Sequence, residues 1–220
     1  KPTIDMCEDY LVIYDKKGTQ IYIMTSQGLV SNIETTMTIE QVSIAAQGTV
    51  AVLMGDQSNS YLVVYDKNGK ELVNGAIYGE DGGYPIAIAL SNDAIKLAVS
   101  MLDINDGNVK TTIAFYNFGS VGENEIDRIV SANSFSDMVI PQLDFVSDDR
   151  MVAYGDSEIA IFEGTQKPKL AQEIPLTGEA KSIFNNNKYV GVVYSNNDEK
   201  LTHHVAVYDM HGFTVMEKDF

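Results

Sequence analysis

The 220-residue chain is 45% hydrophobic and 21% charged, which excludes a disordered chain and leaves ample apolar surface for a core. Its formal net charge of −16 excludes partners with dense negative charge, namely nucleic acids and anionic lipid surfaces. The single cysteine, Cys7, cannot form an internal disulfide, and no apolar run reaches the ~18 residues of a transmembrane helix.

Short segments of alternating apolar and polar residues run through the whole chain and predict β-strands. The stretch 84–117 shows the pattern most clearly, as three strands separated by a polar turn and an acidic loop. Helical periodicity is nearly absent, and Gly, Asn and Asp interrupt the alternation at short intervals. The chain is therefore expected to be built of β-hairpins.

The hairpins repeat as five units of four strands. The residues that end each third strand follow one another at spacings of 41, 51, 46 and 46, typical of propeller blades. These residues are Met24, Tyr65, Tyr116, Phe162 and Tyr208. The blades are expected at about 3–36, 37–78, 84–132, 137–176 and 178–220, with the last strand of the third blade within 123–132.

Two turn sequences, YDKNG and YDMHG, give the repeat a physical basis. Their glycines, Gly69 and Gly212, can adopt the positive φ of a tight hairpin, and Asp66 and Asp209 can cap the turn backbone. A rival register instead aligns YDKKG with YDKNG at a spacing of 51, which would leave the first unit with three strands.

The predicted fold class is all-β: a β-propeller or propeller arc of about five four-stranded antiparallel blades, forming one domain over 1–220. Sheets that are hydrophobic on both faces must stack between neighbours. The chain begins on an innermost strand and ends on an outermost strand. Either five blades close without a shared blade, or the chain is an arc trimmed from a longer propeller.

Acidic loops are expected to gather on one rim of the propeller. Loops joining second to third strands share that rim with the loops joining successive blades. The carboxylates placed there are Asp56, Glu80, Asp81, Asp103, Asp106, Asp137, Asp198 and Glu199. They are interpreted either as a binding face or as solvated connections between strands.

A second set of residues falls at matching positions of the five inner strands. These residues are Asp5, Ser43, Ala87, Asp144 and Ser182. Because they alternate with apolar neighbours, they are expected to face a central channel or to bridge adjacent sheets. The two interpretations are structural hydrogen bonding and a small bound ligand.

The run D-I-N-D-G-N makes Asp103 and Asn105 weak calcium candidates. An EF-hand loop also requires a distal Glu, where this chain has Ala114, and flanking helices, where strands are expected. A type I′ turn is the alternative. No other metal site and no cofactor is expected. No catalytic residue is assigned, because G-x-S-x-G, H-E-x-x-H and tryptophan are all absent.

Four segments are distinctive in sequence: GYPIAIALSNDAIKLAVS, AFYNFGSVGENE, VIPQLDFVSDD and VAYGDSEIAIFEGTQKPKL. Together they resemble an uncharacterised family of membrane-anchored, propeller-like proteins of clostridial Gram-positive bacteria. The resemblance implies an extracytoplasmic domain trimmed at both ends, with an N-terminal membrane helix outside this segment, and it supplies no catalytic residues. LSNDAIKLAVS is also similar to the S-P-D-G-x-x-L-A turn of bacterial propellers, from which the residues 92–94 depart.

The expected function is a non-catalytic extracytoplasmic interaction module that binds a protein or cell-envelope component through the acidic rim. This segment itself is expected to contact neither nucleic acid nor membrane. Two alternatives remain open. One is an extracytoplasmic hydrolase or lyase with its site at the channel mouth, and the other is a structural spacer.

Overall fold

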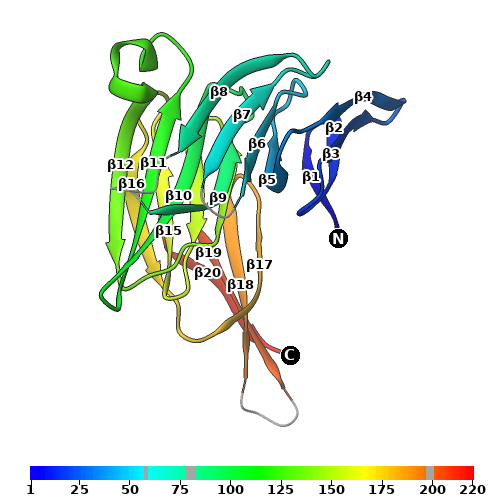
Figure 1. The fold of residues 1–220 in the computed structure, drawn as a ribbon. Coiled ribbons are helices and arrows are strands. Elements are labelled where there is room, and N and C mark those ends of the chain that lie inside the picture. The colour runs from blue at the N-terminus through cyan, green and yellow to red at the C-terminus, as the bar shows by residue number, and fades with distance from the viewer. Residues whose placement is uncertain (57–58, 78–82, 197–200) are drawn as a thin grey trace.

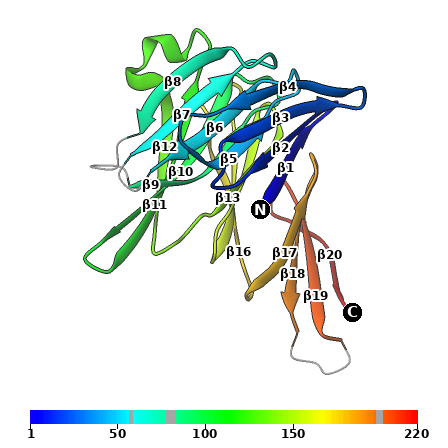
Figure 2. The ribbon, with the colours of Figure 1, turned by 45° about the vertical axis from the view of Figure 1, so that its right-hand side comes forward.

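The computed structural model describes residues 1–56, 59–77, 83–196 and 201–220, and these residues form an all-β structure. Its strands form five four-stranded antiparallel sheets, so the predicted fold class is confirmed. Figures 1 and 2 show the sheets side by side in chain order. Among the described residues, no helix is long and apolar enough to cross a membrane.

Each sheet is formed by four consecutive strands, which run from the inner edge of the fold to the outer edge. Sheet 1 contains β1 (Pro2–Cys7), β2 (Tyr10–Asp15), β3 (Gln20–Thr25) and β4 (Gly28–Glu34). Sheet 2 contains β5 (Thr38–Ile44), β6 (Val50–Gly55), β7 (Ser60–Tyr65) and β8 (Glu71–Ile77). Sheet 3 contains β9 (Tyr84–Leu90), β10 (Lys96–Asn105), β11 (Asn108–Asn117) and β12 (Ile129–Ser136).

The last two sheets follow the same order. Sheet 4 contains β13 (Gln142–Ser147), β14 (Arg150–Tyr154), β15 (Glu158–Glu163) and β16 (Lys169–Pro175). Sheet 5 contains β17 (Ala180–Asn185), β18 (Tyr189–Ser195), β19 (His203–Asp209) and β20 (Thr214–Asp219). Two short 3₁₀ helices, η1 (Gly122–Asn124) and η2 (Ile126–Arg128), lie between β11 and β12.

The core is divided into four apolar clusters, each between two consecutive sheets. Strand β6 is buried along its whole length because it lies in the middle of a sheet that has a neighbour on either face. This packing explains why the central strands of the chain are apolar at successive positions rather than at alternate ones.

The tight turns behave as their sequences predict. In YDKNG, Gly69 has a φ of +82°, and Asp66 Oδ1 accepts hydrogen bonds from the backbone N–H groups of Asn68 and Lys70 at 2.9 and 2.8 Å. In YDMHG, Gly212 also has a φ of +82°. Local side-chain capping therefore fixes these hairpins.

The fourth strand of sheet 3 lies later in the chain than expected. The residues from 122 to 128 form the two 3₁₀ helices, and β12 starts only at Ile129. Asp127 and Arg128 have φ values of +53° and +62°, which a strand cannot accommodate. This correction places Asp127 and Arg128 in a connection beside sheet 2 rather than within sheet 3.

The first and last sheets each leave one apolar face uncovered, whereas the three sheets between them have a neighbour on both faces. On sheet 1, Ile4 is 59% exposed and Met6 is 70% exposed. On sheet 5, Phe184 and Met216 are each 47% exposed. No strand pairing joins sheet 1 to sheet 5 in the part of the chain that the structure describes.

Candidate functional site

The rim expected to be acidic has its described carboxylates concentrated at one end of sheet 3. Asp103 and Asp106 lie at the end of the β10–β11 hairpin, and the Asp137 N–H donates to the Val109 carbonyl at 2.7 Å. Asp56 follows β6 on sheet 2. The other four predicted rim residues, Glu80, Asp81, Asp198 and Glu199, lie outside the described residues.

The end of this hairpin extends beyond the rest of its sheet. Strand β10 pairs with β9 only as far as Leu102, and β11 pairs with β12 only from Lys110 onward. The residues between them, 103–109, therefore form a two-stranded ribbon tip that projects from the sheet in both views (Figures 1 and 2). Within the ribbon tip, the apolar side chain of Ile104 is 67% exposed.

A two-residue turn closes the ribbon tip. Asp106 and Gly107 have φ values of +50° and +81°, which define the type I′ geometry that the right-handed strand twist favours. The calcium candidates Asp103 and Asn105 lie in β10, paired with Lys110 and Asn108. The described residues contain no group of three or more His, Cys, Asp or Glu side chains that could hold a metal ion.

A polar cavity of about 620 Å³ lies among the inner strands, at the position expected for a channel. Asp5, Ser43 and Asp144 line it, as do Gln41 and Asn185, which the sequence pattern did not single out. Ser182 is exposed on β17 and lines a separate recess. Ala87 is fully buried in the core instead.

The polar side chains of the inner strands bridge neighbouring sheets. From sheet 1 to sheet 2, Asp5 Oδ2 accepts a hydrogen bond from the Ile44 N–H at 2.9 Å. From sheet 2 to sheet 3, Ser43 Oγ accepts from the Leu90 N–H at 3.0 Å. Between sheets 4 and 5, Asn185 Nδ2 donates to Asp144 Oδ2 at 2.9 Å.

Two further bridges have no signal in the sequence. Gln41 forms a pair of hydrogen bonds with the backbone of Ile88, at 3.1 and 2.9 Å, and Ser100 Oγ donates to the Ile140 carbonyl at 2.7 Å. Three of the four pairs of consecutive sheets are therefore joined directly by polar contacts near the axis, and Ser100 joins sheet 3 to the connection that leads into sheet 4. These contacts satisfy polar groups that burial would otherwise destabilise.

The electrostatics of the cavity favour protonated groups. Burial raises the pKa of the Asp5 and Asp144 carboxyls, and the charge of Asp144 raises the pKa of Asp5 further. Burial also raises the pKa of the Cys7 thiol to about 11, so the thiolate that a nucleophile requires is scarce at neutral pH.

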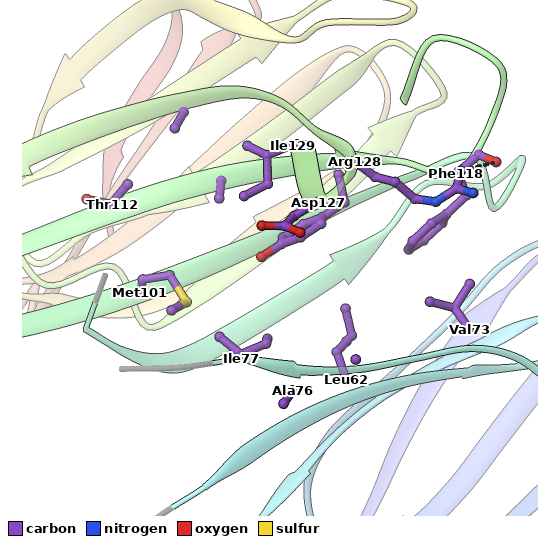
Figure 3. A pocket seen from close by; sticks show the side chains of 14 residues that line it. Leu62, Val73, Ala76, Ile77, Met101, Thr112, Phe118, Asp127, Arg128 and Ile129 are labelled. Atoms are coloured by element: carbon purple, nitrogen blue, oxygen red, sulfur yellow. Dashed lines mark hydrogen bonds between the residues drawn. The ribbon is translucent and has the colours of Figure 1, made fainter. Parts of the chain in front are cut away.

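An apolar groove of about 590 Å³ lies between the outer parts of sheets 2 and 3 (Figure 3). Small residues face it from both sides: Gly75 from β8, Ala114 from β11 and Ala132 from β12. A Cβ added at Gly75 would meet no atom within 4 Å. A glycine inside a predicted strand was the one sequence signal that could have indicated this space.

One end of this inter-sheet groove carries two charged side chains, Asp127 and Arg128 (Figure 3). Arg128 Nη1 donates to the Phe118 carbonyl at 3.4 Å, and Arg128 forms no ion pair with another described residue. A second recess of about 370 Å³ is also lined by Val73, Phe118 and Arg128. The groove therefore continues past the guanidinium toward the opposite rim.

The five stacked four-stranded sheets define this chain as a protein of the β-propeller class. It belongs to a family of unknown function, DUF5711, whose model matches residues 1–220. Comparison with curated protein sequences finds no match.

Solved structures of three other proteins share the fold. A eukaryotic initiation factor is 11% identical with a TM-score of 0.60, and the match covers 100% of this chain and 54% of that chain. The acylaminoacyl peptidase of Pyrococcus horikoshii is 9% identical with a TM-score of 0.59, over 96% of this chain and 38% of that chain. The WD40 domain of Toxoplasma gondii coronin is 13% identical with a TM-score of 0.57, and the match covers 99% of this chain and 58% of that chain.

This chain thus spans about half the length of the initiation factor, since the match covers 54% of that chain. At such low identities the likeness concerns the fold alone. An enzyme and a WD40 domain share it, so function has to be inferred from the residues of this chain.

Proposed function

We propose that this protein is a non-catalytic, extracytoplasmic interaction module that binds a protein or cell-envelope component through its acidic rim loops. Membrane anchoring and a clostridial origin, both implied by the family resemblance, form part of the proposal. The ribbon tip at residues 103–109 is the centre of the binding surface.

The projection of the ribbon tip beyond its sheet is the observation that supports this function. Projecting loops on a rigid sheet scaffold are a common location for binding residues. Here the exposed side chain of Ile104 lies between Asp103 and Asp106, so an apolar contact is flanked by carboxylates. Such an arrangement suits a partner surface with an apolar spot surrounded by basic groups.

A photo-crosslinking amino acid placed at Ile104 tests the proposal in the intact protein on its own cell surface. We expect a covalent adduct with one envelope component, and about tenfold less adduct when Asp103→Asn and Asp106→Asn are combined. Asparagine is well tolerated at the first position of a type I′ turn, so the melting temperature is expected to stay unchanged.

The matched control places the same crosslinker at Asn187, an exposed position at the opposite rim. No adduct is expected there. Equal adducts at residues 104 and 187, or full adduct formation in the doubly substituted variant, would show that the ribbon tip is not the binding surface.

A further inference from the structure

We propose a second binding site, separate from the rim: the inter-sheet groove between sheets 2 and 3 receives an extended peptide segment of a partner protein. The segment inserts an apolar side chain above Gly75 and places a carboxylate near Arg128. This site goes beyond the rim proposal and does not depend on it.

The first reason is that small residues on both walls leave the groove unfilled. Gly75 on one wall and Ala114 and Ala132 on the other line the outer part of the interface between sheets 2 and 3. At the interface between sheets 3 and 4, the phenylalanines Phe115, Phe135 and Phe162 pack with ring centroids 5.1 and 6.3 Å apart. The sheet that packs aromatic rings on one face therefore leaves space for an apolar group on the other.

The second reason concerns the shape of the occupant. Three consecutive residues of β8, from Gly75 to Ile77, line the groove, so the groove follows the strand backbone as well as one of its faces. Strand β8 is the outer edge of sheet 2 and pairs only with β7 in the described part of the chain. An extended peptide can pair with such an edge through its main chain while its alternate side chains enter the groove.

The third reason is charge. Arg128 is a guanidinium in a largely apolar groove, in a chain with twice as many acidic as basic residues, 31 against 15. Among the residues that the structure describes, its side chain forms one hydrogen bond, to the Phe118 carbonyl, and this bond is long at 3.4 Å. A carboxylate of the occupant can form a charge-assisted, bidentate contact there. The charge of Asp127 acts on Tyr116, whose pKa is raised by burial and then by this charge, whereas the Arg128 guanidinium donates to the Phe118 carbonyl. We therefore place the carboxylate of the occupant on the Phe118 side.

The test selects binders from a phage-displayed library of random peptides on the full chain, followed by affinity measurements with synthetic copies of the enriched sequences. We expect alternating apolar residues with one Asp or Glu. A Cβ at residue 75 meets no atom within 4 Å, so the side chain of Gly75→Leu can extend into the groove, and we expect it to weaken binding at least about tenfold. Gly178→Leu, in an exposed loop between sheets 4 and 5, is the matched control and should bind as the parent does.

Arg128→Gln tests the charge. It is expected to weaken the acidic peptide about fivefold to tenfold, and to leave the affinity of the same peptide with Gln in place of the acid unchanged. Failure to enrich any peptide, or unchanged binding in the Gly75→Leu variant, would overturn the proposal. Gly75-dependent binding of a nonanoate probe without peptide enrichment would also overturn it, because the groove would then hold a lipid tail. The variant that combines Asp103→Asn and Asp106→Asn separates this proposal from the rim proposal, because peptide binding in the groove should be unchanged in it.

Discussion

Ala94 has an unfavourable backbone conformation, with a φ of +58° in the turn before β10. This is the position at which the S-P-D-G turn has glycine. The turn is held by its neighbours: Asp93 Oδ1 accepts a hydrogen bond from the Ile95 N–H at 3.0 Å, and Ser91 Oγ accepts from the Lys96 N–H at 2.9 Å. Local hydrogen bonds therefore offset the strain.

Replacing Ala94 with glycine should stabilise the protein. Relief of the left-handed strain exceeds the extra entropy of a glycine in the unfolded chain, so we expect the free energy of unfolding to rise by about 0.5–1 kcal/mol. Thermal unfolding would show this as an increase in melting temperature of about 1–4 °C. Ala98→Gly, in strand β10, is the control and should lower the melting temperature; a decrease for Ala94→Gly as well would contradict the interpretation.

At the scale of the sheets, the buried carboxylate of Asp144 makes the contact between sheets 4 and 5 sensitive to pH. Its pKa is raised by burial, so the folded state holds this proton at pH values where the unfolded chain has lost it. Stability from this group is therefore greatest at acidic pH, and it is lost as the pH rises from the unfolded pKa through the raised folded pKa.

The variant Asp144→Asn keeps an oxygen that can accept the hydrogen bond from Asn185 but removes the charge. We expect it to be more stable than the parent at pH 7, by up to about 1 kcal/mol, with the difference closing as the pH falls toward 4. Denaturant unfolding at a series of pH values measures this difference.

Asp149→Asn should behave in the opposite way. The Ser147 hydroxyl lowers the pKa of Asp149, so Asp149 contributes stability at neutral pH that disappears in acid. A parallel pH dependence for the two variants would refute the burial argument for Asp144.

The strands and turns could be predicted because their causes are local. Alternation marks the strands, and Asp66 with Gly69 specifies a turn within five residues. The bridges of Gln41 and Ser100 could not be predicted, since their partners lie 47 and 40 residues away, in the next sheet for Gln41 and in the connection to the next sheet for Ser100. The inter-sheet groove was missed for the same reason, because it depends on how Gly75 is placed against Ala114.

At the scale of the whole molecule, the outer face of sheet 1 forms an uncovered apolar surface. The register aligns Met6 with Leu11, Leu11 with Met24, and Met24 with Leu29 in one row across the sheet. Apolar patches of this kind mark contact surfaces or cause association. We therefore expect the 220-residue chain to self-associate as its concentration rises.

Sedimentation velocity over a concentration series checks this expectation. Met6→Lys combined with Leu29→Lys should keep the chain monomeric at concentrations where the parent associates. Ile126→Lys removes an isolated exposed side chain, 87% exposed, and should leave association unchanged. Equal suppression by Ile126→Lys would attribute the effect to added positive charge in general.

The four apolar clusters are arranged in series, each shared by two adjacent sheets only. Sheets 1 and 5 thus rely on a single cluster apiece, whereas the inner sheets rely on two. Local unfolding of sheet 1 or sheet 5 leaves the remaining interfaces intact. We therefore expect unfolding to start at the two outer sheets and to proceed toward the inner ones. The groove beside Gly75 lies between sheets 2 and 3, both of which keep a neighbour on either side.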